Sequence, residues 1–210
     1  MPAPLASLVL VPALPEFQAR YPDILLDLGV SDRKVDIIDQ NVDCVVRGGE
    51  LTDLSLRARH VGDLCLGVYA APSYLARVGT PESPQEVDGS GHSVIGYRGA
   101  RIGTPLPQSL RKGDVRIDVR GRTVLMVDDG NAYLSAGVAG LGLLWLPTYM
   151  ARAALARGEL VQLFDDWEID PMPLYIAFPQ SRHVSRKLRV FIDWVVELLA
   201  SHNSDIIVLR

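Results

Sequence analysis

Two adjacent acids, a glycine and an asparagine at 128–131 form the polar turn of this chain that is best placed for ligand chemistry. The apolar run Val124–Val127 precedes the turn, and an alanine-rich segment of helical character follows it. A buried parallel strand that ends where a helix begins has this pattern. Ligands bind at the carboxyl ends of such strands, because helix N-termini and free backbone N–H groups converge there. The sequence therefore predicts a small-molecule site built from several strand ends.

The two acids of this turn have more than one interpretation. Adjacent side chains point in different directions, so Asp128 and Asp129 are not expected to act together on one substrate. An acid that precedes a helix commonly caps it by accepting a hydrogen bond from a backbone N–H group. Lining the ligand site is the alternative, and the sequence leaves both open.

Two other predicted strands end in cations. Arg47 follows the apolar run Val42–Val46 and precedes two glycines, so it can serve as a structural ion-pair partner or clamp an anionic ligand. Tyr97 and Arg98 end a third strand and offer a stacking ring and a cation. An ordinary surface position explains these two residues equally well.

Residues for catalysis or metal binding do not form a recognisable set. The chain has four histidines: His60, His92, His183 and His202. None has metal-ligand spacing, and exposed loop positions are the expectation for them. There is no G-x-S-x-G turn and no phosphate-binding loop lysine. The glycines at 137–142 join a helix to a strand, the reverse of a dinucleotide fingerprint, and predict close helix–strand packing. We expect no enzyme activity, no cofactor and no metal.

Composition narrows the class of protein. Of 210 residues, 48% are hydrophobic and 22% charged, as in ordinary globular proteins. A net charge of −4 without a basic face argues against direct nucleic-acid binding. Cys44 and Cys65 lie in apolar runs and are predicted to be buried free thiols. Because no apolar run is long enough to cross a membrane and the N-terminus lacks a basic leader, a cytoplasmic protein is expected.

The order of predicted elements indicates two α/β lobes. Helices are predicted at 7–20, 35–40, 72–77, 132–139, 148–157 and 185–200. Strands are predicted at 24–29, 42–49, 64–70, 93–98, 115–119, 124–127, 140–147, 159–164 and 174–178. The segment 80–91 is predicted to be a loop with one helical turn, 99–113 a loop, and 115–119 antiparallel. Pro12 predicts a late start or a kink in the first helix.

Alternating strands and helices predict parallel strands with right-handed crossovers. Connections at 64–70 and 164–178 would join two lobes that close on a ligand like a hinge.

Six segments in this order resemble the effector-binding region of LysR-type transcriptional regulators. They are 8–38, 42–51, 71–87, 94–98, 127–147 (VDDGNAYLSAGVAGLGLLWLP) and 173–199. The resemblance implies an α/β fold like the type 2 periplasmic binding proteins, with two Rossmann-like lobes joined by two hinge strands. Lobe I would comprise 1–66 and 170–204, lobe II 67–169, and 205–210 would be a C-terminal tail.

The same resemblance implies a sensor of a small-molecule effector in the cleft between the lobes. The regulatory domain would form a homodimer or tetramer, with helices at 7–20 and 132–139 in the contact. DNA would be bound only by a winged helix-turn-helix domain that this sequence does not contain, so we expect the sensing half alone. A solute-binding protein for a small anionic metabolite is the alternative function, and an enzyme is a weaker third.

Eight positions carry over from the family's cleft. They are Ser31, Asp32, Arg47, Gly48, Tyr97, Arg98, Asp129 and Asn131. The chain departs from the family pattern at Asp128, where Asn is usual, and the added charge disfavours a carboxylate effector. The family's first strand would stand before Pro4, and its loss would expose strand edges. We hypothesise that the strand-like run Ile206–Leu209 fills that place.

Overall fold

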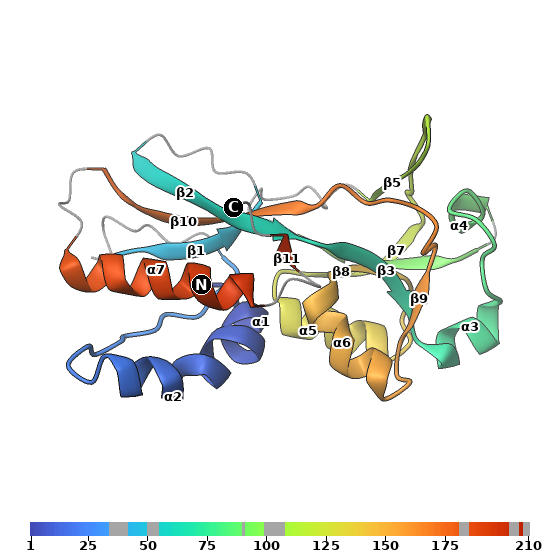
Figure 1. Ribbon diagram of the computed structural model, residues 1–210. Coiled ribbons are helices and arrows are strands. Elements are labelled where there is room, and N and C mark those ends of the chain that lie inside the picture. Colours follow the sequence, from blue (N-terminus) through green and yellow to red (C-terminus); the bar gives the residue numbers. More distant parts are fainter. Residues whose placement is uncertain are drawn as a thin grey trace. The chain divides into compact units, whose positions relative to one another are not determined.

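The computed structural model describes residues 1–33, 42–49, 55–89, 91–98, 108–180, 185–201 and 206–207. Its contacts divide the chain into two compact units. Unit 1 comprises Met1–Leu64 and Met172–Arg210, and unit 2 comprises Cys65–Pro171. Each unit combines helices with strands, as the α/β prediction requires (Figure 1). The predicted helix at 35–40, like His183 and His202, lies outside the described residues.

Unit 1 contains a four-stranded sheet in the order β1-β10-β2-β11. The strands are β1 (Val45–Gly48), β10 (Met172–Pro179), β2 (Leu56–Leu64) and β11 (Ile206–Ile207). Every pairing in this sheet is antiparallel, so the prediction of parallel strands from the β-α-β alternation is wrong here. The reason is that β10, which returns from unit 2, inserts between the two strands that are neighbours in sequence.

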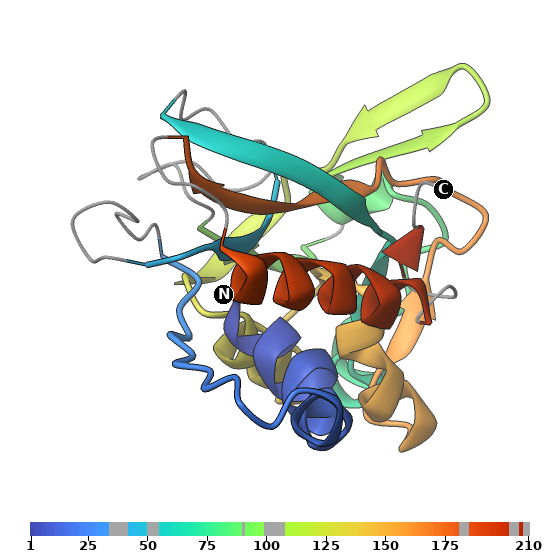
Figure 2. The same ribbon diagram turned by 60° about the vertical axis from the view of Figure 1, so that its left-hand side comes forward.

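The helix α7 (Arg186–Ala200) covers one face of this sheet, as both views show (Figures 1 and 2). The Ser185 hydroxyl accepts a hydrogen bond from the Leu188 N–H group at 3.1 Å and caps the helix, as predicted. Apolar side chains at helical spacing are buried beneath it, among them Ile192 and Val195. The helix α7 thus contributes its apolar side chains to the core of unit 1.

The N-terminal helical stretch lies on the other side of α7 (Figure 2). It consists of α1 (Ala3–Leu5), a π-helical turn η1 (Ala6–Leu10) and α2 (Val11–Arg20). The first of the two predicted alternatives, a late start, is wrong, because the helix begins at Ala3. The regular helix is instead interrupted by the wide turn that precedes Pro12, which is closer to the second alternative, a kink. Phe17 is fully buried, and its ring centroid lies 4.7 Å from that of Trp194 in α7.

The predicted strand at 24–29 does not form a ladder. Met1 donates its amino group to the Gly29 carbonyl at 2.8 Å, and the Ser31 N–H group donates to the Met1 carbonyl at 2.9 Å. This pair of bonds is a parallel bridge of a single residue. An apolar run becomes a strand only where a neighbour pairs with it, and here the pairing stops after one bridge. The tail does form a strand, but Ile206 pairs with Leu64 of β2 and not beside this segment.

The sheets of unit 2 place parallel and antiparallel strands side by side. The strand β3 (Leu66–Ala70) pairs antiparallel with β8 (Leu144–Pro147) and β9 (Val161–Leu163). The strand β4 (Ser93–Tyr97) pairs in parallel with β7 (Arg122–Val127), and a parallel bridge from Val94 to Leu143 joins β4 to β8. The parallel pairing predicted for the strand before the turn at 128–131 is therefore confirmed, whereas β3 of the same unit pairs antiparallel. The strand β7 is exposed to half-buried, and not buried as predicted.

Helices cover these strands at close range. They are α3 (Pro72–Val78), α4 (Glu86–Gly89), α5 (Gly130–Val138) and α6 (Thr148–Ala156). A side chain on Gly137 would meet Leu144 Cδ1 at 2.5 Å, and one on Gly142 would meet the Ser93 carbonyl oxygen at 2.4 Å. The contact at Gly137 confirms close helix–strand packing, and the contact at Gly142 shows a close approach of the turn before β8 to β4. In Figure 1, α5 and α6 lie side by side.

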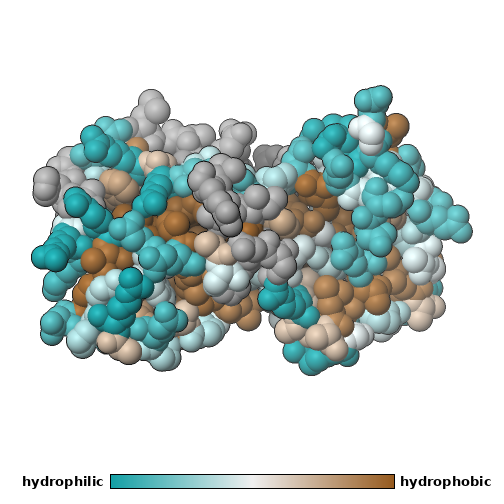
Figure 3. Space-filling view, viewed as in Figure 1, coloured by the Kyte–Doolittle hydropathy of each residue, from teal (hydrophilic) through white to brown (hydrophobic). Residues whose placement is uncertain are grey.

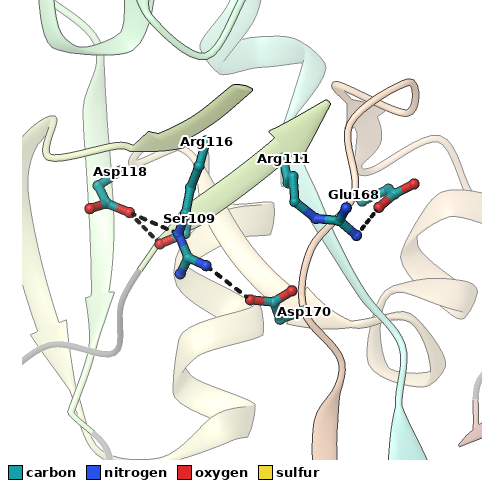
Figure 4. Close-up of polar contacts among 6 residues, drawn as sticks. All are labelled: Ser109, Arg111, Arg116, Asp118, Glu168 and Asp170. Carbon is teal, nitrogen blue, oxygen red and sulfur yellow. Dashed lines mark hydrogen bonds and ion pairs between the residues drawn. The ribbon is translucent and has the colours of Figure 1, made fainter. Parts of the chain in front are cut away.

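A two-stranded hairpin extends from unit 2. Its strands are β5 (Ser109–Lys112) and β6 (Val115–Asp118), so the prediction of loop over 99–113 is wrong at its end, and 99–107 are not described. Arg111 pairs with Glu168 by side chain and backbone, and Arg116 reaches Asp170 at 3.4 Å (Figure 4). The tip is mainly hydrophilic (Figure 3). These polar contacts thus hold the exposed β5–β6 hairpin against the segment 168–170, which precedes β10.

No helix within the described ranges is long and apolar enough to span a membrane.

Candidate functional site

The polar residues predicted in unit 2 meet at the carboxyl ends of β4 and β7. Tyr97 is the last residue of β4 and pairs with Val127, the last residue of β7. The next N–H group, that of Arg98, donates to the Val127 carbonyl at 2.7 Å, and the Arg98 side chain is exposed. The turn Asp128–Asp129 follows at once, so a ring, a cation and two acids share one edge of the sheet.

Asp129 caps the helix that begins at this edge. Its Oδ1 atom accepts a hydrogen bond from the Ala132 N–H group at 2.8 Å, which confirms the capping interpretation of this acid. Asn131 is exposed in the first turn of α5. The positions of Asp129 and Asn131 do not show whether either residue contacts a ligand, so their binding roles stay predictions.

A buried tyrosine ties the strand ends together. The Tyr133 hydroxyl donates to the Ile95 carbonyl at 3.1 Å and accepts from the Trp145 N–H group at 3.0 Å. Its ring centroid lies 5.3 Å from that of Tyr97. Burial raises the pKa of the Tyr133 hydroxyl, opposed by its hydrogen bonds to Trp145 and Gln108, so it remains a neutral donor at physiological pH.

The predicted residues in unit 1 gather around the first residue of the chain. The Ser31 N–H group donates to the Met1 carbonyl, and Asp32 Oδ1 accepts from the Ala3 N–H group at 2.9 Å. Burial lowers the pKa of the Met1 amino group, while the nearby Cys44 and Asp32 oppose this and Arg47 adds to it. Arg47 is therefore close to the same group. Asp32 is already engaged in holding the start of α1.

Arg47 and Gly48 lie in β1, where β10 runs close alongside. Arg47 pairs with Tyr175 and Gly48 with Leu174 of β10. A side chain on Gly48 would come within 2.9 Å of Met172 Sδ, so it would require the flexible Met172 side chain to move. Whether Arg47 clamps an anion stays a prediction.

Acid–base and metal chemistry find little support in this arrangement. No group of three or more histidine, cysteine or acidic residues that could hold a metal occurs in the described part of the chain. Burial raises the pKa of the half-buried Cys44 thiol to about 11, so it is protonated and unreactive at neutral pH. The arrangement offers hydrogen-bond donors, a cation and rings, which are groups that can hydrogen-bond to a small molecule or stack on it.

Two histidines differ from the prediction of exposed loops. His92 is buried, and its Nδ1 atom lies 3.1 Å from the Tyr74 hydroxyl. His60 is half-buried in β2, and its Nε2 atom lies 2.9 Å from Asp63 Oδ1. Both follow or interrupt polar stretches, which made them look exposed in the sequence. The pairing partners that bury them are not visible there.

Sequence reasoning also missed Tyr133, Trp145 and Gln108. The only signal was their type, because a tyrosine or tryptophan in an otherwise apolar or small-residue stretch carries a polar atom that needs a partner.

Comparisons with known proteins agree on one family. The family model for the LysR substrate binding domain matches residues 1–200. An HTH-type transcriptional repressor of Pseudomonas aeruginosa is 34% identical over 198 residues, which cover 94% of this chain and 62% of that protein. The chain thus spans less than two thirds of that relative's length.

Solved structures give the same result. The regulatory domain of CrgA, a LysR-type transcriptional regulator from Neisseria meningitidis, matches with a TM-score of 0.79 and 30% identity, over 93% of this chain and 94% of that one. The regulatory domain of AphB from Vibrio vulnificus matches with a TM-score of 0.71 and 25% identity, over 93% and 95%. The fold is therefore that of LysR regulatory domains, which resemble type 2 periplasmic binding proteins. The family is one of transcription regulators and not of enzymes. This chain belongs to the LysR substrate-binding domain family.

Proposed function

We propose that this chain is the part of a transcription regulator that binds a small-molecule effector. The observation that carries the proposal is the meeting of Tyr97, Arg98 and the turn at 128–129 on one sheet edge, in a chain of this family. In α/β folds this edge is where ligands bind, because backbone N–H groups and helix N-termini converge on it.

The effector would contact both units in the cleft expected for this family. Unit 1 would contribute Ser31, Asp32, Arg47 and Gly48, and unit 2 would contribute Tyr97, Arg98, Asp129 and Asn131. Binding changes the relation between two lobes only if the ligand has different affinities for their arrangements. The exposed cation of Arg98 and the half-buried cation of Arg47 favour an effector with an acceptor group on each side.

Regulation of transcription would then depend on a DNA-binding domain and on the oligomer as well. The relatives are described as HTH-type regulators and are longer than this chain. We propose that a helix-turn-helix domain works together with the regulatory domain described by this chain. We also propose that the regulatory domain forms a dimer or tetramer. Effector binding would alter the geometry of that assembly and thereby its affinity for DNA.

A thermal-shift screen tests the effector-binding role. Aromatic acids, amino acids and sugar acids are added singly, and a true effector raises the melting temperature progressively, with the logarithm of its concentration once the site is saturated. Arg98→Ala and Arg47→Ala are each expected to weaken binding about tenfold, since each removes a charge-assisted hydrogen bond.

Matched controls come from exposed arginines on the same units. Arg120→Ala in unit 2 and Arg57→Ala in β2 remove a surface cation outside the proposed site and should leave affinity unchanged. Equal loss in all four variants would indicate general charge attraction, and undiminished binding in Arg98→Ala and Arg47→Ala would refute the assignment of the site.

A further inference from the structure

Unit 1 brings arginines from two distant parts of the chain to one of its surfaces. Arg57 and Arg59 lie in the first half of β2, and Arg186 and Arg189 lie in the first turns of α7. All four residues are exposed. We call these four residues the arginine surface. The two pairs are far apart in the sequence, so only the fold joins them.

The helix α7 runs alongside β2 in the same direction. Near the middle of both elements, Arg59 Nη1 forms an ion pair with Asp193 Oδ1 at 3.1 Å. After the end of the helix, Ile206 of β11 pairs with Leu64, the last residue of β2. Both views show the helix and the strand side by side (Figures 1 and 2). Positions along the helix can therefore be matched with positions along the strand.

One step before this ion pair, both elements carry an arginine. Alternate residues of a strand point to the same face, so Arg57 shares the α7 side of the sheet with Arg59 and lies about 6.6 Å before it. Arg189 lies four residues before Asp193 on the same side of the helix, which is about 6 Å along the axis. Because the two steps match, Arg57 and Arg189 stand at the same level. Arg186 continues the row on the helix, three residues before Arg189.

The arginine surface does not serve the stability of unit 1. The guanidinium groups of Arg57, Arg186 and Arg189 make no hydrogen bond or ion pair within the described ranges, whereas Asp193 is engaged by Arg59. Like charges three residues apart on a helix repel each other. No acid lies in the first turn of α7, and cations are unfavourable at the positive end of a helix. These positions therefore call for an anionic partner.

The exposure and spacing of these arginines fit a polyanion better than a small anion. Exposed charges give a single small anion little binding energy, because water and salt screen them. A polyanion instead releases its condensed counterions when several cations bind it, and this gain grows with the number of contacts. Guanidinium groups suit phosphate because they can form two parallel hydrogen bonds to it. The relatives of this chain are HTH-type transcriptional regulators, so DNA is the polyanion on which such proteins act.

We propose that the arginine surface of unit 1 contacts the phosphate backbone of DNA. The contact is weak and independent of base sequence, because arginines that reach only phosphates carry no sequence information. It adds to the binding by a helix-turn-helix domain and does not replace it. The inference goes beyond the proposed function, since it involves neither the effector nor the strand ends of unit 2. It also revises the expectation drawn from the net charge of −4, because an acidic chain can still gather cations on one surface.

Fluorescence anisotropy tests this contact with the intact chain and a labelled DNA duplex of about 20 base pairs, which is two turns of the double helix. Binding is measured from about 50 to about 200 mM sodium chloride. If Arg57, Arg186 and Arg189 each neutralise one phosphate, the logarithm of the association constant should fall with that of the salt concentration with a slope of about −2.7. Arg57→Ala and Arg189→Ala should each reduce the size of this slope by about 1 and weaken binding at the lowest salt concentration.

Lys187→Ala is the matched control. Lys187 is exposed at the same end of α7, but adjacent residues of a helix do not face the same side, so it lies outside the row of Arg186 and Arg189. The substitution removes the same charge and should leave the slope unchanged. A second readout is the melting temperature without DNA, which Arg189→Ala should leave unchanged or raise. Arg59→Ala breaks the ion pair to Asp193 and should not raise it.

Three results would overturn the inference. One is an anisotropy that stays constant at about 50 mM salt with the protein at about 1 mM. Another is an equal loss of affinity in Lys187→Ala and Arg189→Ala, which would indicate attraction to the overall charge of this helix end. The third is poly-L-glutamate binding more tightly than the duplex at equal charge, which would make the partner an acidic protein. None of these results bears on effector binding, which the thermal-shift screen tests separately.

Discussion

The two units hold their candidate binding residues in different ways. In unit 2 these residues follow the ends of parallel strands, and a buried tyrosine bonds one strand to the next. In unit 1 the strands are antiparallel, and Ser31 and Asp32 are held by Met1 and Ala3. Parallel strand ends supply several free donors at one edge, whereas antiparallel strands do not. We infer that unit 2 provides the preformed part of the site.

The largest expected effect tests the core of unit 1. Phe17→Ala removes a fully buried ring that packs against Trp194, and should destabilise the protein by about 3–5 kcal/mol. Hydrogen exchange should accelerate in α7 and stay protected in α5 if the units unfold separately. Leu8→Ala, at an exposed position of the same helical stretch, should cost well under 1 kcal/mol. Equal acceleration in both helices would contradict independent units.

The corresponding change in unit 2 is Tyr133→Phe. It leaves the Ile95 carbonyl and the Trp145 N–H group without their shared partner, at a cost of about 1–3 kcal/mol. Urea unfolding followed by fluorescence measures the loss. Ser135→Ala, exposed on the same helix, should be nearly neutral. A neutral Tyr133→Phe would mean that the strand ends of unit 2 do not depend on this hydroxyl.

Removing the acid that accepts a hydrogen bond at the start of a helix should lower stability by a smaller amount in each unit. Asp129→Ala and Asp32→Ala each remove a side-chain acceptor from a backbone N–H group, and each should lower stability by about 1 kcal/mol. The Asn variants keep an acceptor oxygen and should retain most of it. Thermal unfolding provides the comparison. A loss that Asn fails to restore would point to the charge of the acid, and not to capping.

The smallest effect is a pH dependence confined to unit 2. Burial lowers the pKa of His92, and nearby Glu86 opposes this only in part. The unfolded chain then takes up a proton first, so stability is fully present above the ordinary histidine pKa of about 6.5 and falls as the pH drops below it. The loss should be smaller than that of the Asp129→Ala variant. His92→Gln should flatten the dependence, and a rise in stability on acidification would contradict the sign.

Features set by neighbours in sequence could be predicted, and those set by distant partners could not. The Ser185 cap, the Asp129 cap and the small residues facing Leu144 are local and were foreseen. The strand predicted at 64–70 includes only the last residue of β2. The rest of β2 was missed because its first half carries exposed arginines at 57 and 59. The antiparallel place of β1 depends on β10, more than a hundred residues later.

The candidate site follows the same rule. Strand-end residues such as Tyr97 and Arg98 were predicted because polar residues after an apolar run mark a sheet edge. The buried hydroxyl of Tyr133 was not, because its partners Ile95 and Trp145 lie on two other segments of the chain.

The wide turn η1 sets the angular position of everything that follows it in the N-terminal helix. An α-helix advances about 100° per residue, so one residue more or less rotates the downstream face by more than a quarter turn. One residue inserted into the regular helix after this turn would swing Phe17 away from Trp194, and losing one residue from Ala6–Leu10 would place Pro12 inside a regular helix. Spacing in this turn is therefore expected to tolerate substitution far better than insertion or deletion.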